Sequence, residues 1–446
     1  MKNVTAQLAD YIANRRYEDL STEETTVARQ CLLDYLGVTM AGRDEPLVTI
    51  LRGQQLTEGG NAQSSLVGMD KRVTASQAAL INGAAAHAHD YDDVHMAMSG
   101  HPTVPVAPAL LALAEREGKS GRDLIGSLVT GLEAECLIGR YVGGSHYARG
   151  FHATATLGTF GAAAACANLL QLDPSRTRRV LGIAATQAAG LKSMFGTMCK
   201  PLHAGKAAAN GLLAAELASA GFDSHADALE VEQGFALTHS DSPSAADFES
   251  ALAQGKLVPA TLFKYHAACY MTHSAMEGTA HLKSVHGIDP DDVDEVTLHV
   301  DKGHFSVCNI QAPRTGLEAK FSLRFTTAMI LHGVDTADIN GYTDALVNTP
   351  ELVATRDKIH VLAREHPSRD THVAIRLKSG ECFETDWNVA IPESDLDLQW
   401  RKLEAKFLTL ARPVVGEGNA LAIVDAIRGL DGVNGLDDLF SRVRGV

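Results

Sequence analysis

The pattern of apolar and polar positions changes twice along this chain of 446 residues. Up to about residue 262, apolar residues recur at helical spacing in long segments that glycine, proline and serine separate. Between 263 and 395, shorter runs with strand-like alternation stand among helical segments, and from 396 to 446 the spacing is helical again. The pattern predicts a mainly α protein with a large all-helical domain, residues 1–262 and 396–446, and a smaller α+β lid domain, residues 263–395.

Two helices of the first region show their ends in the sequence. The segment "LSTEETTVARQCLLDYLGVTMAG" begins with a capping box, Ser21 to Glu24, and stops at Gly42. The segment "VPVAPALLALAEREGKSG" offers Pro108 as a first-turn residue and ends at Gly118. We expect a helix over each segment, the second one starting near Pro108.

The region from 263 to 395 contains three strand-like runs. "VDEVTLHV" (293–300) and "KIHVLA" (358–363) predict single strands, and "HVAIRLKSGECFETDW" (372–387) predicts a hairpin that turns at "KSG". "YMTHSAMEGTAHLKSVHG" and "FSLRFTTAMILHG" predict helices among these strands.

Composition and charge narrow the possible partners. The net charge of −15 disfavours nucleic acid, which needs a basic surface. We see no apolar run that approaches the roughly 20 residues of a membrane span, and the N-terminal segment resembles an amphipathic helix rather than a signal peptide. The seven cysteines are scattered without a CxxC pair, which favours neither a disulfide framework nor a zinc–thiolate site. We expect a cytoplasmic protein with no membrane or nucleic-acid partner.

The segment "AHAHDYDDVHMAMSGHP", residues 86–102, holds four histidines and three aspartates. Histidine and carboxylate side chains at such spacings can bind a metal, but HExxH and other established metal spacings are absent. The alternative interpretation is that many of these groups cap helices or lie in a solvated loop. Gly100 and Pro102 place His101 on a loop ahead of an apolar helix, which makes it a candidate for acid–base chemistry.

Three further polar clusters stand out. "GSHYARGFHATATLGTFGAA" contains Tyr147 and His152 just before a helix of small residues. "GTMCKPLHAGKAAANG" contains Lys200 and His203. The apolar surroundings of Lys200 are expected to shield it from water, and a lysine so placed can act as a base near neutral pH. "FKYHAACYMTH" places Lys264 at the expected domain junction, where a cation can hold a substrate carboxylate.

These blocks, taken in order and together with "EAKFSLRF", resemble the MmgE/PrpD family across nearly the whole chain. That family includes 2-methylcitrate dehydratase, cis-aconitate decarboxylase and iminodisuccinate epimerase. The resemblance implies a large helical domain, a smaller α+β lid domain and a homodimer. It also implies that no metal and no organic cofactor is needed, and that the substrate is a small anionic di- or tricarboxylate.

The resemblance assigns site residues position by position. Asp90 matches the first aspartate of the D-x-D-D motif, His101 the histidine before proline, His152 the histidine of G-F-H-x-T, and Lys200 the lysine of K-P-x-H. Lys264 matches the lysine at the domain junction.

Three more residues follow with less direct matches. Tyr147 stands where the epimerase-like branch has a tyrosine that faces the lysine across the substrate. His203 completes the K-P-x-H block, and Arg324 follows "FSL". The decarboxylase branch often has a tyrosine one position later, where this chain has Phe325. We assign catalysis to Lys200, Tyr147, His101 and His152, and substrate binding to Asp90, His203, Lys264 and Arg324, with a solvent-facing Arg324 as the alternative.

Two classes of reaction fit these residues. The leading hypothesis is a cofactor-independent epimerase of a small dicarboxylate such as iminodisuccinate, in which two bases exchange a proton beside a carboxylate. The alternative is a lyase of the same family, either a 2-methylcitrate dehydratase or a cis-aconitate decarboxylase. A metal-dependent hydrolase built on the Asp90 to His101 cluster, and a helical dimer without catalysis, are further alternatives.

Overall fold

In the computed structural model, the chain divides into two compact units. Unit 1 comprises Met1–Phe263 and Ser394–Val446, and unit 2 comprises Lys264–Glu393. The structure describes residues 3–366 and 368–445, so the remaining positions of the two predicted domains lie outside the described residues.

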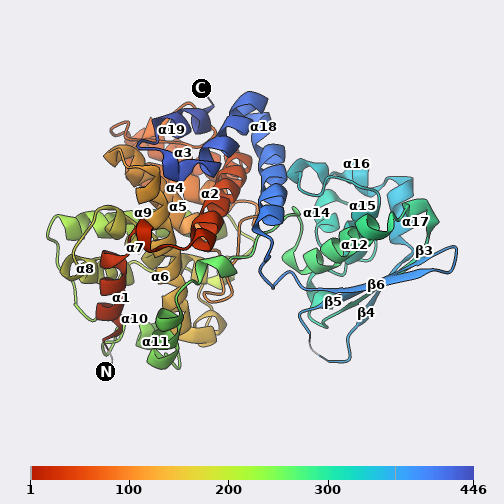
Figure 1. Ribbon diagram of the computed structural model, residues 1–446, viewed down its shortest axis with the longest axis horizontal. Helices are drawn as coiled ribbons and strands as arrows, with labels where there is room; N and C mark the ends of the chain where they lie inside the picture. Colours follow the sequence, from red (N-terminus) through yellow and green to blue (C-terminus); the bar gives the residue numbers. More distant parts are fainter. Residues whose placement is uncertain (1–2, 367, 446) are drawn as a thin grey trace. The chain divides into compact units, whose positions relative to one another are not determined.

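Unit 1 is built from helices and one two-stranded antiparallel pair (Figure 1). Its helices are α1 (Val4–Asn14), α2 (Thr22–Gly42), α3 (Pro46–Glu58), α4 (Ala75–Ala86), α5 (Thr103–Glu117), α6 (Gly121–Ala148), α7 (Ala153–Leu169), α8 (Pro174–Ala185), α9 (Cys199–Ser219), α10 (Phe235–His239), α11 (Ala245–Gln254), α18 (Leu396–Arg428) and α19 (Asp437–Arg444), and its short strands are β1 (Ser64–Ser65) and β2 (Arg72–Val73). The prediction of a mainly α protein is confirmed.

Local sequence signals set the ends of α2 but not the start of α5. Ser21 and Glu24 form the predicted capping box of α2, which ends at Gly42. The prediction that α5 starts near Pro108 is wrong, because the helix begins at Thr103 and Pro108 lies inside it. Pro105 is the first-turn proline, at a position whose N–H has no partner within a helix.

The core of unit 1 depends on small residues that let helices approach closely. All residues of α7 are buried, and α7 packs against α5, α6 and α9. Where α4 crosses α9, a Cβ added to Gly205 would lie 2.2 Å from the carbonyl oxygen of Leu80. Only glycine allows this approach, which brings the end of α4 beside the start of α9.

Helix α18 returns the chain to unit 1 and packs against α2. It kinks at Gly416, whose φ of 77° is left-handed. Contrary to the sequence-based expectation, this one helix is long and apolar enough to span a membrane by length and composition. A core helix of a soluble protein meets the same criterion, so the finding is weak support for a span.

Unit 2 combines short helices with a four-stranded sheet. The helices are α12 (His273–His286), α13 (His304–Val307), α14 (Gly316–Ala319), α15 (Leu323–Leu331), α16 (Asp344–Val347) and α17 (Pro350–Arg356), and the strands are β3 (Val293–Val300), β4 (Ile359–Ala363), β5 (Thr371–Leu377) and β6 (Cys382–Trp387). The strand order is β4-β3-β5-β6. Strand β4 runs parallel to β3, whereas β5 is antiparallel to both β3 and β6.

The sheet has one covered face. Burial alternates along β3 and β5, as expected of strands with one face against a core. Helix α12 contacts β5 and β6, and α15 contacts β4. The two predicted single strands and the hairpin are confirmed, whereas the role of this unit as a lid stays a prediction.

Candidate active site

Three elements of unit 1 converge on the candidate site. Helix α4 ends at Ala86 and leads into the loop that carries Asp90, Asp92 and His101. Helix α9, which packs against α4, begins at Cys199 and presents its neighbour Lys200. Residues far apart in the sequence are therefore brought together by the close α4–α9 packing.

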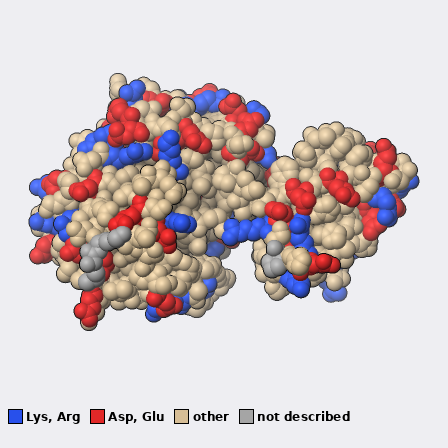
Figure 2. Space-filling model, turned by 60° about the horizontal axis from the view of Figure 1, so that its bottom comes forward, with Lys and Arg blue, Asp and Glu red and all other residues tan. Residues whose placement is uncertain are grey.

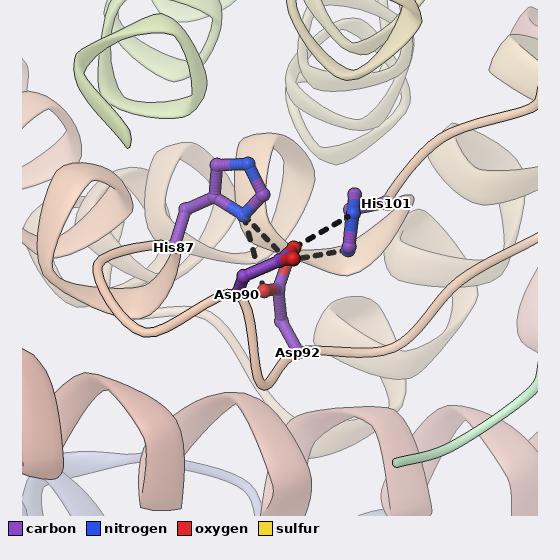
Figure 3. Close-up of side chains that lie close together, drawn as sticks. All are labelled: His87, Asp90, Asp92 and His101. Carbon is purple, nitrogen blue, oxygen red and sulfur yellow. Dashed lines mark hydrogen bonds and ion pairs between the residues drawn. The ribbon is translucent and has the colours of Figure 1, made fainter. Parts of the chain in front are cut away.

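The carboxylate of Asp92 lies between two imidazole rings (Figure 3). Its oxygens are 3.0 and 2.9 Å from Nδ1 of His87, and Oδ2 is 3.0 Å from Nδ1 of His101. The two rings meet edge to face with centroids 4.7 Å apart. Asp92 thus fixes the orientation of both histidines.

His87 and Asp92 differ in charge. Burial lowers the pKa of His87 to about 4, so this ring is neutral at pH 7, and its buried Nε2 has no hydrogen-bond partner. Burial alone would raise the pKa of Asp92, but its electrostatic interactions and hydrogen bonds with His101 and His87 hold that pKa well below its ordinary value. Asp92 is therefore a carboxylate at pH 7 that accepts hydrogen bonds from the rings on either side.

Asp90 joins His101 to Lys200. Its Oδ1 lies 2.8 Å from Nζ of Lys200 and 3.3 Å from Nε2 of His101. The side chain of Asp90 is 56% exposed, whereas that of Lys200 is 15% exposed. The ammonium of Lys200 and a ring nitrogen of His101 therefore meet at one exposed carboxylate oxygen, where a substrate carboxylate would find the same partners.

The backbone at Asp90 is unusual. Its φ is 52°, in the left-handed region that residues other than glycine adopt rarely, although aspartate tolerates it better than most. This conformation turns the chain between His87 and Asp92, which places Asp90 toward Lys200 while Asp92 faces the two histidines.

His152 and His203 form a second histidine pair. Their Nδ1 atoms are 3.0 Å apart, so one ring donates and the other accepts. Burial, together with neighbouring positive groups, lowers the pKa of His152 to about 2, and burial followed by the charge of Lys200 lowers that of His203. The pair is neutral at pH 7, which leaves one Nε2 as a donor and the other as an acceptor. Phe195 packs edge-on against His152 with centroids 5.0 Å apart.

Tyr147 stands in the last turn of α6, after a kink at Gly143. The ammonium of Lys192 lies 3.7 Å from the centre of its ring. Burial and the charge of Asp90 raise the pKa of Tyr147, so it is a phenol at neutral pH. The side chain can donate a proton but is a poor base.

Two polar residues of the segment 86–102 have structural roles, but they are buried rather than in the solvated loop that the alternative interpretation expected. His95 is buried and its Nε2 bonds the carbonyl oxygen of Leu257. Asp93 accepts hydrogen bonds from the amide and the hydroxyl of Thr103. Burial, and then the charge of Asp34, raise the pKa of Asp93 to about 8.

A buried lysine of α18 contacts the loop that carries Asp90 and Asp92. Lys406 is 2% exposed, forms an ion pair with Asp34 of α2, and donates a hydrogen bond to the carbonyl oxygen of Tyr91 at 2.8 Å. Its ammonium also lies 3.8 Å from the centre of the Tyr91 ring. Since Tyr91 stands between Asp90 and Asp92, Lys406 anchors the turn that points these carboxylates in two directions.

The remaining two predicted site residues belong to unit 2. Lys264 is buried, and its charge adds to burial and to His266 in holding the pKa of His273 well below its ordinary value. Arg324 is half-buried rather than fully exposed, and donates to the carbonyl oxygen of Ile359 at 3.0 Å and to Oδ1 of Asn309 at 2.7 Å. These bonds hold the guanidinium within unit 2, and its substrate-binding role stays a prediction.

The sequence did not single out three residues of this arrangement. His87 and Asp92 stood in the polar cluster, but only their contact with His101 distinguishes them from its structural members. For Lys406 the sequence offers one signal of burial. The lysine stands in α18 beside Leu403 and Phe407, which are apolar and buried.

The same cluster meets the simplest requirement of a metal site. His87, Asp90, Asp92 and His101 each offer a ligand atom, and these atoms lie within 4.8 Å of one another. Imidazole and carboxylate groups suit divalent transition metals. The ammonium of Lys200 already supplies positive charge at Asp90, and the absence of a metal requirement stays a prediction.

The fold and the site define a two-unit helical enzyme whose cations and neutral histidines suit a carboxylate substrate. The chain belongs to the MmgE/PrpD family. Residues 6–247 match the MmgE/PrpD N-terminal domain, and residues 266–431 match the MmgE/PrpD C-terminal domain.

Similar proteins include cis-aconitate decarboxylases from animals and a fungus. The Homo sapiens protein is 28% identical over 92% of this chain and 89% of its own length. The Mus musculus protein is 27% identical over 92% of this chain and 88% of its own length. The Aspergillus terreus protein is 31% identical over 52% of this chain and 49% of its own length. These similarities favour the lyase alternative over the epimerase that the sequence put first.

Proposed function

We propose that the chain is a lyase that removes carbon dioxide from a small unsaturated tricarboxylate such as cis-aconitate. The similarity to cis-aconitate decarboxylases over nearly the whole chain supports this reaction. The observation that carries the proposal is the meeting of Lys200 and His101 at Asp90 Oδ1, beside the neutral histidine pair.

The chemistry of the substrate sets what the site must supply. When the carboxylate on the saturated carbon leaves as carbon dioxide, the electron pair of the broken C–C bond forms a new double bond to the central carbon, and the electrons of the original double bond move to the far carbon. Negative charge then develops at the far carbon and on its carboxylate, and a proton added to that carbon gives a methylidene dicarboxylate. Cations must stabilise the developing charge, and an acid must deliver the proton.

The described residues can fill these roles. Lys200 and His101 would hold the carboxylates that stay on the product, through charge-assisted hydrogen bonds. Tyr147, whose raised pKa keeps it a phenol, would donate the proton. The neutral pair of His152 and His203 would bind polar substrate atoms without adding charge.

An epimerase needs a proton acceptor on one face of the reacting carbon and a proton donor on the other. Tyr147, a phenol at neutral pH, suits the donor in an epimerase as well as in a lyase, so the choice of the lyase rests on the similarity to decarboxylases. The sequence-based argument against decarboxylation was the phenylalanine at position 325. That side chain is fully buried among the apolar residues of unit 2, and the similarity to decarboxylases outweighs it.

The test is the release of carbon dioxide from cis-aconitate by the purified protein, compared with Lys200→Ala and with Lys206→Ala. Lys206 lies on the same helix and is exposed, so its substitution is a matched control. We expect product from the natural protein and from Lys206→Ala, with a loss of at least about 100-fold in Lys200→Ala. Equal rates for both variants, or no carbon dioxide from any protein, would contradict the proposal.

A further inference from the structure

Lys192 places a half-buried ammonium against Tyr147, the proposed proton donor. Its Nζ donates a hydrogen bond to the backbone carbonyl oxygen of Tyr147 at 3.0 Å and lies 3.7 Å from the centre of the Tyr147 ring. Within residues 3–366 and 368–445, no carboxylate oxygen lies within ion-pair distance of this ammonium. The positive charge of Lys192 is therefore directed at Tyr147 rather than neutralised by an acid.

Few other contacts hold the side chain of Tyr147. Its hydroxyl has no hydrogen-bond partner among the residues that the structure describes. The residue also borders a cavity of about 290 Å³, so packing does not enclose it completely. The hydroxyl is therefore available to a substrate, while the contact with Lys192 limits how the ring can move.

The main chain fixes Lys192 beside Tyr147. Phe151 and Leu191 form an antiparallel bridge, and the amide of Lys192 donates to the carbonyl oxygen of Gly150 at 2.8 Å. The bridged segment follows Tyr147 by only a few residues, so the backbone of Lys192 is tied to the backbone that carries the tyrosine. The contact thus does not depend on the flexible lysine side chain alone.

We propose that Lys192 is a positioning residue that orients Tyr147 and stabilises the phenolate that forms when Tyr147 gives up its proton. The inference rests on the proposed function, in which Tyr147 protonates the far carbon of the substrate. In that step the O–H bond of Tyr147 breaks, the proton forms a C–H bond with the carbanion, and the electron pair stays on the phenolate oxygen. Solvent then returns a proton to the phenolate.

The contact with Lys192 becomes stronger when the proton leaves. Over a neutral phenol, the ammonium is attracted by the electron density of the ring face. Over a phenolate it meets a full negative charge in a half-buried place, where water screens the attraction less than in bulk solvent. An interaction that strengthens along the reaction lowers its barrier.

The other ionisable groups around Tyr147 stay the same in every variant of Lys192. Burial and then the charge of Asp90 raise the pKa of Tyr147, so both oppose the effect proposed for Lys192. Three further ionisable residues line the cavity that Tyr147 borders, namely Arg140, His146 and Asp247. Differences between the variants therefore report on Lys192.

The kinetic test compares Lys192→Met, which removes the charge at similar length, with Lys192→Arg, which keeps it. We expect kcat for carbon dioxide release to fall about 10-fold in Lys192→Met with KM nearly unchanged, and to stay near the natural value in Lys192→Arg. In a Tyr147→Phe background, Lys192→Met should cause no further loss, because the two residues act as one unit. Lys206→Met, at an exposed lysine of α9, is the matched control and should keep full activity.

A titration without substrate tests the charge separately from the reaction. Tyrosine that carries an isotope label at Cζ is followed by NMR as the pH rises, and Tyr147→Phe identifies the signal of Tyr147. We expect Tyr147 to ionise at higher pH in Lys192→Met than in the natural protein, because the phenolate has lost its cation, and at nearly the natural pH in Lys192→Arg. This result does not require decarboxylation of cis-aconitate, so the inference and the proposed function can fail separately.

Two results would overturn the inference. One is an unchanged titration of Tyr147 in Lys192→Met. The other is an equal fall in kcat on Lys192→Met with tyrosine and with phenylalanine at position 147, which would give Lys192 a role independent of Tyr147. If Lys192→Met lowers the melting temperature, Lys192→Gln replaces it in both tests, because glutamine keeps a donor for the carbonyl oxygen without the charge.

Discussion

Two neighbouring aspartates of the site loop carry different charges because their partners differ. Asp92 faces two histidines, which hold its pKa well below the ordinary value against the effect of burial. Asp93 faces Thr103 and the charge of Asp34, and its pKa rises to about 8. At pH 7 Asp92 is therefore a carboxylate, whereas Asp93 is mostly protonated.

Replacing Asp92 with asparagine should remove the charge that supports His101. We expect kcat for carbon dioxide release to fall by at least about 100-fold, because His87 and His101 lose the carboxylate that holds both rings in place. Asp93→Asn is the matched control and should retain most activity at pH 7. Full activity of Asp92→Asn would show that Asp92 only supports packing.

Asp93→Asn should instead change how stability depends on pH. A carboxyl with a raised pKa contributes stability below its unfolded value of 3.8, and that contribution is lost as the pH rises through about 8. Asparagine cannot ionise. The melting temperature of the variant minus that of the natural protein should therefore increase from about pH 4 to about pH 8 and stay constant above pH 8. Parallel melting curves across this window would contradict the assignment.

The prediction that no metal is needed also depends on individual residues. Because Lys200 supplies positive charge at Asp90, we expect exhaustive treatment with a chelator to leave carbon dioxide release unchanged. Activity that disappears on chelation and returns with a divalent metal would instead assign His87, Asp90, Asp92 and His101 as ligands.

The sequence predicted which residues belong to the site better than it predicted which of them are in contact. Asp90, His101 and Lys200 stand in polar clusters that local context marks. Which aspartate faces which partner depends on the left-handed backbone of Asp90, and no sequence pattern predicts that conformation for an aspartate.

At the scale of elements, α18 is coupled to the site through Lys406. Lys406→Met would leave Asp34 buried without its cation and Tyr91 without its anchor. We expect a loss of about 3–5 kcal/mol in the free energy of unfolding, measured by chemical denaturation.

The control variants separate this contact from general effects on the helix. Arg401→Met alters an exposed cation of α18 and should change stability little. Adding Asp34→Leu to Lys406→Met removes the stranded carboxylate and should restore much of the loss. Equal small losses for Lys406→Met and Arg401→Met would contradict the coupling.

The ends of elements show where local signals suffice. The capping box of α2 involves only residues within one turn, so Ser21 and Glu24 could be predicted. The start of α5 could not be predicted in this way, because both Pro105 and Pro108 are suited to a first turn. The helix begins at Thr103, and residues 103–107 are all buried.

At the scale of the whole molecule, the net charge of −15 disfavours an anionic substrate unless local cations hold it. Figure 2 shows acidic as well as basic side chains on the visible face of both units. Lys200 supplies the local positive charge at Asp90 that the overall field does not.

The family could be recognised from the sequence because its blocks run through almost the entire chain. The choice between epimerase and lyase could not, since both reactions use a cation, an acid and histidines beside a carboxylate. A phenol at Tyr147 could donate the proton in either reaction, and the similarity to cis-aconitate decarboxylases is what favours the lyase.

The most direct test of the proposed reaction is proton NMR of cis-aconitate incubated with the protein in D₂O. We predict a methylidene dicarboxylate with one deuterium at the carbon that received the proton, and no such product with Lys200→Ala. Exchange or inversion at the carbon beside a carboxylate of a dicarboxylate such as iminodisuccinate, with no decarboxylated product from cis-aconitate, would contradict the lyase and restore the epimerase.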